Sequence, residues 1–123
     1  MNIYDKLHEL TRAIEQSDEY KRYKRAAEKV DSNDAHSKML KDFIAAQMQI
    51  STSKMLGQEP TQEMISSFNT LYSTISSISD ISEFLSAQAV FSVVMEDVSR
   101  EINKSASVEV KFLEMPDFSG SNI

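Results

Sequence analysis

The residues best suited to chemistry in this sequence are its two histidines and the acids near them. Asp5 and His8 are three residues apart, so a helix would place them on one face, as in half of a carboxylate-bridged di-iron site. The other histidine, His36, has Asn33 rather than an acid at that spacing, and Arg12 stands where a zinc protease would need a histidine after His8. We therefore interpret His8 as a solvated side chain and predict no metal site and no cofactor.

The sequence also lacks the residues of a covalent catalyst. It has no cysteine, which removes a thiol nucleophile, a thiolate metal site and a cysteine-ligated iron–sulfur cluster. Its serines have no base at a spacing typical of a catalytic triad. With two glycines in 123 residues, it has no glycine-rich loop for phosphate. We predict that the protein is not an enzyme, has no catalytic residue and takes no small-molecule substrate.

A basic segment interleaved with aromatic residues runs from Tyr20 to Lys29. Its five cations are Lys21, Arg22, Lys24, Arg25 and Lys29. Cations beside stacking rings are typical of RNA-binding surfaces. However, the two tyrosines fall on the apolar stripe of a predicted helix, and Glu19 and Glu28 are placed to pair with the cations. We interpret the segment as a solvated helix face with buried tyrosines, and keep a contact with RNA or an acidic partner as the alternative.

The methionines allow two interpretations as well. An adaptable binding groove is one, because methionine is common on such surfaces. Methionine at helical spacing is more often core, which is the interpretation that we prefer. The residues concerned are Met39, Met48, Met55, Met64 and Met95.

Helices must position all of these residues, because the four strong helix breakers fall in two short stretches, Gly57 with Pro60 and Pro116 with Gly120. Elsewhere, apolar residues recur in steps of three and four. The pattern predicts four helices over about 2–16, about 18–30, a segment after 34 that ends at Gly57, and about 62–77. A fifth helix, capped by Ser79 or Asp80, should have about 26 residues and a length close to 40 Å.

The last predicted helix carries the most regular apolar stripe. Its residues alternate steps of three and four like a coiled-coil seam: Ile81, Phe84, Gln88, Phe91, Met95, Val98 and Ile102. The helix is longer than a compact domain of this size needs, and a long apolar stripe left in water would cause aggregation. We therefore predict a homodimer whose contact includes Phe84, Phe91, Met95, Val98 and Ile102.

The predicted fold class is all-α, an antiparallel bundle of four to five helices with a long C-terminal helix. Residues 1–106 should form one helical domain, and residues 107–123 a flexible C-terminal tail. In that tail, the alternation of Val108, Val110 and Phe112 with charged residues leaves a short strand or a frayed extension open. The segment 116–121 should be disordered.

Charge and hydropathy limit the binding partners and the cellular location that the protein can have. A net charge of -6 and a pI near 4.9 argue against binding of nucleic acid or anionic membrane by the whole surface. The first residues lack the basic segment and apolar run of a signal peptide, and there is no span of about 18 apolar residues. We predict a cytoplasmic protein that does not contact membranes.

Beyond these patterns, a set of residues is distinctive in order and in spacing: Asn2-Ile3-Tyr4-Asp5-Lys6, Leu10, Ala13-Ile14, Ser17, Glu19-Tyr20-Lys21, Tyr23-Lys24, Phe43, Gln47 and Gly57-Gln58-Glu59-Pro60. With these residues, the sequence resembles the YlbF/YmcA/YheA family of small bacterial proteins over about residues 1–105. The resemblance implies an all-helical, often dimeric cytoplasmic protein without enzymatic activity. It also implies, for the YlbF and YmcA branches, partnership with YaaT in a complex that assists RNase Y and affects competence, sporulation and biofilm formation.

The absence of cysteine decides which branch is most similar. The YlbF and YmcA proteins use cysteines for iron–sulfur ligation, so this chain resembles most the cysteine-free YheA branch. We predict a non-catalytic regulatory or scaffolding protein that acts through helix-mediated protein–protein interaction with a helical partner, with a link to RNA processing or developmental regulation. The alternative is an RNA-binding accessory protein that uses the basic Tyr20–Lys29 patch.

Overall fold

The computed structural model describes residues 2–113. The helices in this range are α1 (Ile3–Gln16), α2 (Asp18–Asp31), α3 (Asp34–Met55), α4 (Gln62–Ser76) and α5 (Ser79–Ser105), followed by a 3₁₀ turn at Lys111–Leu113. The predicted all-α fold class and long C-terminal helix are confirmed.

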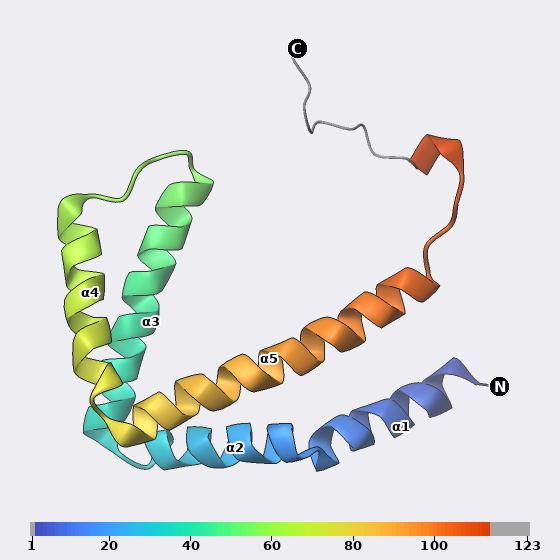
Figure 1. Cartoon of the computed structure of the whole chain (residues 1–123), viewed down its shortest axis with the longest axis horizontal. Helices are drawn as coiled ribbons and strands as arrows, with labels where there is room; N and C mark the ends of the chain where they lie inside the picture. Colours follow the sequence, from blue (N-terminus) through green and yellow to red (C-terminus); the bar gives the residue numbers. More distant parts are fainter. Residues whose placement is uncertain (1, 114–123) are drawn as a thin grey trace.

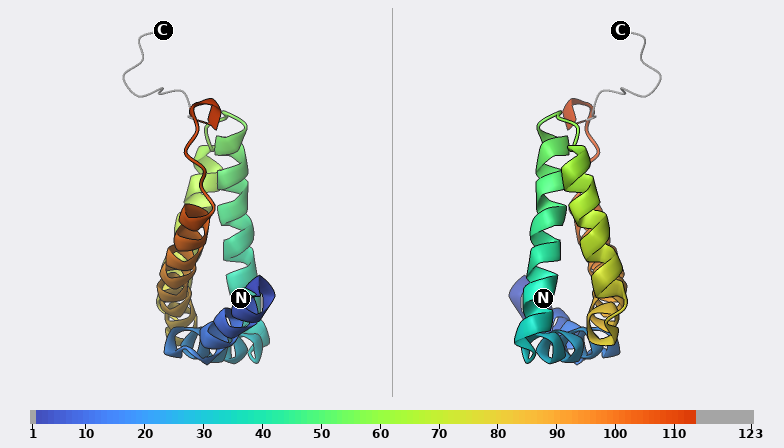
Figure 2. Two further views of the ribbon diagram at one scale, coloured as in Figure 1. Left: turned by 90° about the vertical axis from the view of Figure 1, so that its right-hand side faces the viewer. Right: turned by 90° about the vertical axis from the view of Figure 1, so that its left-hand side faces the viewer.

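The helices form two parts that meet at a corner. Figure 1 shows α2 and then α1 lying along α5, while the hairpin of α3 and α4, here called the arm, stands away from them. Figure 2 shows α4 on the same side of the molecule as α5 and α3 on the other side, with α1 and α2 crossing beneath them. Within residues 2–113, no single helix is long and apolar enough to cross a membrane; α4 and α5 reach that length and composition only together, across a bend of 105°.

Local side chains determine where four of the helices begin. Asn2, Ser17, Asn33 and Thr61 each accept a hydrogen bond from a backbone N–H in the first turn, at 2.8–3.2 Å. α5 differs, because it begins after Ile78 with no side-chain cap. The cap predicted at Ser79 or Asp80 is wrong: both residues lie inside the first turn, where the Asp80 charge still interacts favourably with the helix dipole.

α3 ends at the glycine that the sequence indicated. Gly57 has φ 73°, the left-handed conformation that glycine adopts without a steric penalty. Its N–H donates to the Lys54 carbonyl at 3.1 Å, and the Gln58 N–H donates to the Ser53 carbonyl at 2.9 Å. These two bonds form a Schellman motif, so the turn satisfies carbonyls that the helix end would leave without partners.

The core lies at the corner, where α2, α3, α4 and α5 meet. Its residues are Ala26, Val30, Leu40, Phe43, Ile75, Ile81, Phe84 and Ala87. Ile75 and Ile81, on either side of the α4–α5 bend, are completely buried. In α5 the seam departs from its prediction near its middle, since Ala87 is buried and Gln88 is exposed. Away from the corner, both parts of the molecule bury their apolar residues only in part.

The described part of the predicted tail contains the 3₁₀ turn, so the strand considered for residues 108–112 is wrong. Val108 and Phe112 are exposed there. The disorder predicted for 116–121 lies outside the described residues, and the domain boundary at residue 106 stays a prediction.

Candidate functional site

The predicted seam on α5 is divided by α2 into a covered half and a free half. Phe84 is buried, with its ring centroid 5.6 Å from that of Tyr23. Phe91 is half-buried and stacks on Tyr23 at 5.5 Å, with Tyr20 at 5.6 Å. These contacts confirm that the tyrosines of the basic segment pack inward. The same contacts engage Phe84 and Phe91, two of the five residues that the sequence assigns to a dimer contact. The dimer contact stays a prediction for Met95, Val98 and Ile102.

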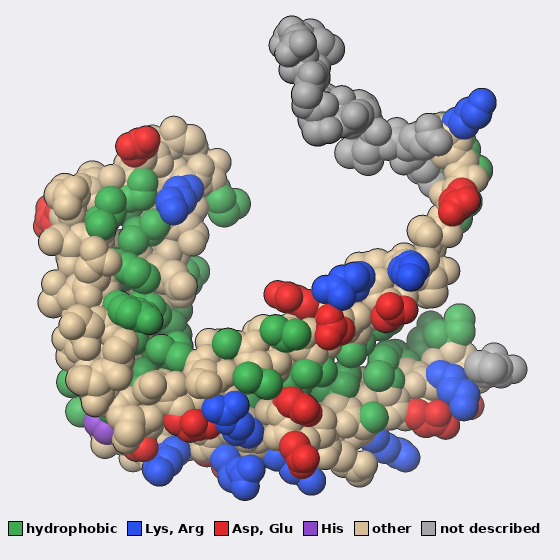
Figure 3. Space-filling view, viewed as in Figure 1, with side chains coloured by type: hydrophobic (Ala, Val, Ile, Leu, Met, Phe, Trp, Pro, Cys, Tyr) green, Lys and Arg blue, Asp and Glu red, His purple; other side chains and the backbone are tan. Residues whose placement is uncertain are grey.

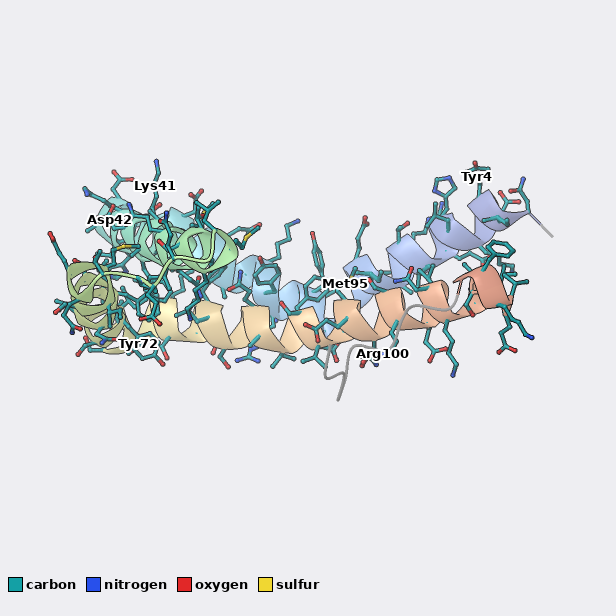
Figure 4. All side chains as sticks on the ribbon, turned by 90° about the horizontal axis from the view of Figure 1, so that it is seen from above. Tyr4, Lys41, Asp42, Tyr72, Met95 and Arg100 are labelled. Atoms are coloured by element: carbon teal, nitrogen blue, oxygen red, sulfur yellow. The ribbon has the colours of Figure 1, made fainter. Side chains whose placement is uncertain are left out.

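The free half of α5 lies along the apolar stripe of α1. The apolar side chains become more exposed to solvent toward the start of α1 and the end of α5. We call these residues the splayed seam: Leu7, Leu10 and Ile14 of α1 with Met95, Val98 and Ile102 of α5. Leu10, Ile14, Met95 and Val98 are half-buried, whereas Leu7 and Ile102 are 45% and 50% exposed. Figure 3 shows hydrophobic side chains along the interval between α1 and α5.

The stripe also continues past the seam, because Ile3 is 80% exposed. Water contact along an apolar stripe is unfavourable by about 25 cal/mol per Å². The splayed seam is therefore a surface suited to another apolar helix.

Two cations of the basic segment form ion pairs with acidic side chains of α5. Arg22 donates from Nε to Glu83 Oε1 at 2.6 Å, and from Nη2 to Glu83 Oε2 at 3.2 Å and Ser86 Oγ at 3.1 Å. Lys29 Nζ lies 3.4 Å from Asp80 Oδ1. Within residues 2–113 the ion pairs of this segment thus reach α5, and the pairing expected with Glu19 and Glu28 is wrong.

The Arg22–Glu83 pair changes the acidity of both groups. The hydrogen bond from Arg22 lowers the pKa of Glu83, with a smaller Coulombic contribution in the same direction and desolvation opposing them. The same hydrogen bond raises the pKa of Arg22. Both effects favour the charged forms, so the pair joins α2 to α5 at neutral pH.

The remaining cations of the segment are on the outer side of α2. Lys21, Lys24 and Arg25 are exposed, and with Glu28 they line an open depression of about 290 Å³. The predicted patch for RNA or an acidic partner is therefore reduced from five cations to three with a carboxylate beside them.

The two histidines are on different helices, His8 on α1 and His36 near the start of α3. Asp5 and His8 are exposed on α1. Over the described range, 2–113, no three His, Asp or Glu side chains are grouped so that they could hold a metal ion. His36 is near the start of α3, where its Nδ1 atom is buried without a hydrogen-bond partner.

The arm presents a second apolar surface that sequence reasoning missed. Ile44 and Met48 of α3 are 41% and 63% exposed, and Ile65 and Tyr72 of α4 are 36% and 53% exposed. We call these four residues the arm face. Figure 3 shows hydrophobic side chains in a column along the arm. The sequence did contain a signal for this surface. Ile44 and Met48 are four residues apart and Ile65 and Tyr72 are seven apart, spacings that place each pair on one helix face, outside the main apolar stripe.

The methionines are divided between core and surface. Met39 packs against the core and Met64 is half-buried, as the core interpretation predicts. That interpretation is wrong for Met48 and Met55, which are exposed. Met95 is half-buried, in the other part of the molecule, so the five methionines do not form one groove.

Comparison with known proteins agrees with the predicted resemblance. A protein from Caldicellulosiruptor bescii named UPF0342 protein is 34% identical over 110 residues, which cover 89% of this chain and 91% of the relative. Another UPF0342 protein, from Halothermothrix orenii, is 38% identical over 100 residues, 81% of this chain and 85% of the relative. The placement in the YheA branch stays a prediction.

The fold is also similar to that of a protein whose structure is solved. Bacillus subtilis RicA, crystallised in complex with RicF, superposes with a TM-score of 0.58 and 16% identity, covering 82% of this chain and 90% of the matched chain. In sequence, residues 3–107 match a family model that takes in α1 to α5. The chain therefore belongs to the family described as "Control of competence regulator ComK, YlbF/YmcA".

Proposed function

We propose that the protein is a non-catalytic adaptor of bacterial cytoplasmic regulation, and that it binds a helix of another protein along the splayed seam. The observation that carries this proposal is the loss of cover along α1 and the free half of α5, with Leu7 and Ile102 half exposed. A partner helix would supply apolar side chains at helical spacing for this surface. The family's description as a control of ComK, and the complex of RicA with RicF, support protein contact as the mode of action.

The rim of the splayed seam supports a reversible contact. Beside the stripe of α1, Lys6 pairs with Glu9 at 3.2 Å. Both side chains are more than half exposed, and such an ion pair contributes little to stability. It can exchange its partners for charges on an incoming helix at low cost. An apolar centre with a charged rim is the usual composition of a protein interface.

A second candidate function, contact with RNA, rests on Lys21, Lys24 and Arg25. These cations are exposed on one outer side of α2. Three cations release few counterions, and the net charge of -6 opposes a polyanion. We therefore rank this function second. A shift of RNA mobility at low salt that disappears in the triple variant Lys21→Ala, Lys24→Ala, Arg25→Ala would favour it.

The adaptor proposal is tested by site-specific photo-cross-linking in the native host. A photoreactive residue is placed at Leu7 or Ile102, and at Lys41 on α3 as a control remote from the seam. We expect one discrete heterologous adduct from Leu7 and Ile102 and none from Lys41, and we expect Ile102→Glu to abolish the adduct at Leu7. Equal adducts at all three sites, or no adduct at Leu7 and Ile102, would contradict the proposal.

A further inference from the structure

We propose that the outer side of α2 binds an acidic helix of another protein. Its residues, here called the outer α2 face, are Lys21, Lys24, Arg25 and Glu28, and the partner carries carboxylates opposite the three cations. Figure 3 shows Lys and Arg side chains gathered along the lower edge of the molecule, over α2. This surface is separate from the splayed seam, so the inference does not depend on the proposed function.

The outer α2 face is a helical stripe that no other helix of residues 2–113 pairs with. Positions 21, 24, 25 and 28 are spaced i, i+3, i+4 and i+7, so their side chains are neighbours. All four side chains are exposed and line the open depression of about 290 Å³. Within residues 2–113, no ion pair includes any of them. Three neighbouring cations without acidic partners, on a chain of net charge -6, are a local surface suited to an acidic ligand.

The neighbouring side of α2 shows how this helix contacts an acidic helix. There Arg22 lies 2.6 Å from Glu83 and Lys29 lies 3.4 Å from Asp80, and both acids belong to α5. Arg25 is shared between the two sides, because it also lines a second depression of about 300 Å³ to which Glu83 contributes. Thus α5 supplies carboxylates to one side of α2, and a partner helix would supply them to the outer side in the same way.

The aromatic residues favour a protein partner over RNA. A surface that binds single-stranded RNA presents exposed rings beside its cations, because bases stack on them. Tyr20 and Tyr23 instead pack against Phe91, with ring centroids 5.6 and 5.5 Å from that of Phe91. The outer α2 face therefore offers charge without rings for stacking.

Glu28 gives the face a mixed pattern of charge. A nucleic acid repeats negative charge along its backbone, so a phosphate would meet the Glu28 carboxylate. A protein helix can instead place acids opposite the cations and a lysine opposite Glu28. Like charges placed opposite each other reduce affinity, so the pattern selects a partner with the matching sign at each position.

The test is an NMR titration of the isotope-labelled, full-length protein with designed helical peptides. The matched peptide carries three glutamates on one face and a lysine one turn away, and a scattered peptide of the same composition distributes them around the helix. We expect the matched peptide to shift the amide signals of residues 21–28 and to bind about 10-fold more tightly than the scattered one. Equal binding of the two peptides, or no shift at residues 21–28, would overturn the inference.

Variants of equal charge separate this face from the general charge of the chain. Lys21→Ala with Arg25→Ala should weaken binding of the matched peptide by about 5-fold. The control Lys41→Ala with Lys104→Ala removes as many exposed cations from α3 and α5 and should change the binding by less than about 2-fold, because these charges are screened over distance. Alanine favours helix, so both variants should keep their circular dichroism. Equal weakening by the two pairs of substitutions would contradict a specific face.

A charge exchange at Glu28 distinguishes the protein partner from RNA. The comparison uses the matched peptide and an all-glutamate peptide, in which glutamate replaces the lysine, at physiological ionic strength, where screening over about 8 Å leaves nearest neighbours dominant. We expect wild type to prefer the matched peptide and Glu28→Lys to prefer the all-glutamate peptide. Preference for the all-glutamate peptide by both proteins, or tighter binding of a uridine oligonucleotide than of either peptide, would show a surface that recognises negative charge alone and would refute the acidic helix as its partner.

Discussion

At the scale of single residues, the structure depends most on the side chains buried at the corner. Ile81 has no exposed surface and packs beside Ile75 in a core drawn from four helices. We expect Ile81→Ala to lower the free energy of unfolding by about 2–5 kcal/mol, because it leaves a cavity that neighbouring helices can close only in part. Ile44→Ala, at an exposed site on α3, should cost much less. Urea denaturation of both variants checks this, and equal losses would contradict the corner as the centre of the core.

The Arg22–Glu83 pair should make part of the stability depend on pH. Its hydrogen bond lowers the pKa of Glu83 in the folded chain, so this contribution is complete above the unfolded value of about 4.3 and is lost as the pH falls through the lower folded value. Glu83→Gln should therefore have a slightly lower Tm than wild type at pH 7, with the difference shrinking by pH 3. Thermal unfolding followed by circular dichroism measures this.

The matched control for this pair is Glu101→Gln. Glu101 is an exposed carboxylate on the same helix, and no ion pair of the described residues includes it. Its substitution should leave the difference between pH 7 and pH 3 the same as in wild type. If Glu101→Gln reduces the acid sensitivity as much as Glu83→Gln does, general charge rather than the specific pair is responsible.

At the scale of the helices, Gly57 ends α3 by its backbone conformation alone. A Cβ atom at this position would meet nothing within 4 Å, so the cost of substitution comes from the φ of +73° and not from crowding. We expect Gly57→Ala to destabilise by about 1 kcal/mol and Gly57→Asn by less, because asparagine tolerates the left-handed region. Chemical denaturation distinguishes the two, and an alanine variant as stable as wild type would refute the strain argument.

The helix limits were predictable because the signals that set them are local. Ser17, Asn33 and Gly57 each act within three or four residues of their own position, which a sequence displays directly. The start of α5 was predicted wrongly because Ile78 packs against the core, and this tertiary contact fixes the helix without a cap. Propensity alone gave Ser79 and Asp80 as the better caps.

The surfaces were less predictable than the helices. The sequence showed that α5 has a continuous apolar seam, but not that Tyr20 and Tyr23 of α2 cover Phe84 and Phe91. For the same reason, Arg22 was assigned to acids on its own helix although its partner is 61 positions away in the chain. Such pairings depend on which helices become neighbours, and helical periodicity does not determine that.

At the scale of the whole molecule, the bent shape separates two apolar surfaces that are partly exposed to solvent. The splayed seam lies along α1 and the free half of α5, and the arm face lies beyond the 105° bend, on α3 and α4. The corner core between them is the best-packed part of the chain. Because the two surfaces lie on different helices, each can contact a partner without the other.

We expect the two surfaces to act independently, since no residue is shared between them. The double variant Met48→Glu with Tyr72→Glu on the arm face should still give the heterologous adduct from a photoreactive residue at Leu7. Conversely, Ile102→Glu should lose that adduct. If the arm variant also loses the adduct at Leu7 while its helical spectrum is intact, the arm face takes part in partner binding and the two surfaces do not act independently.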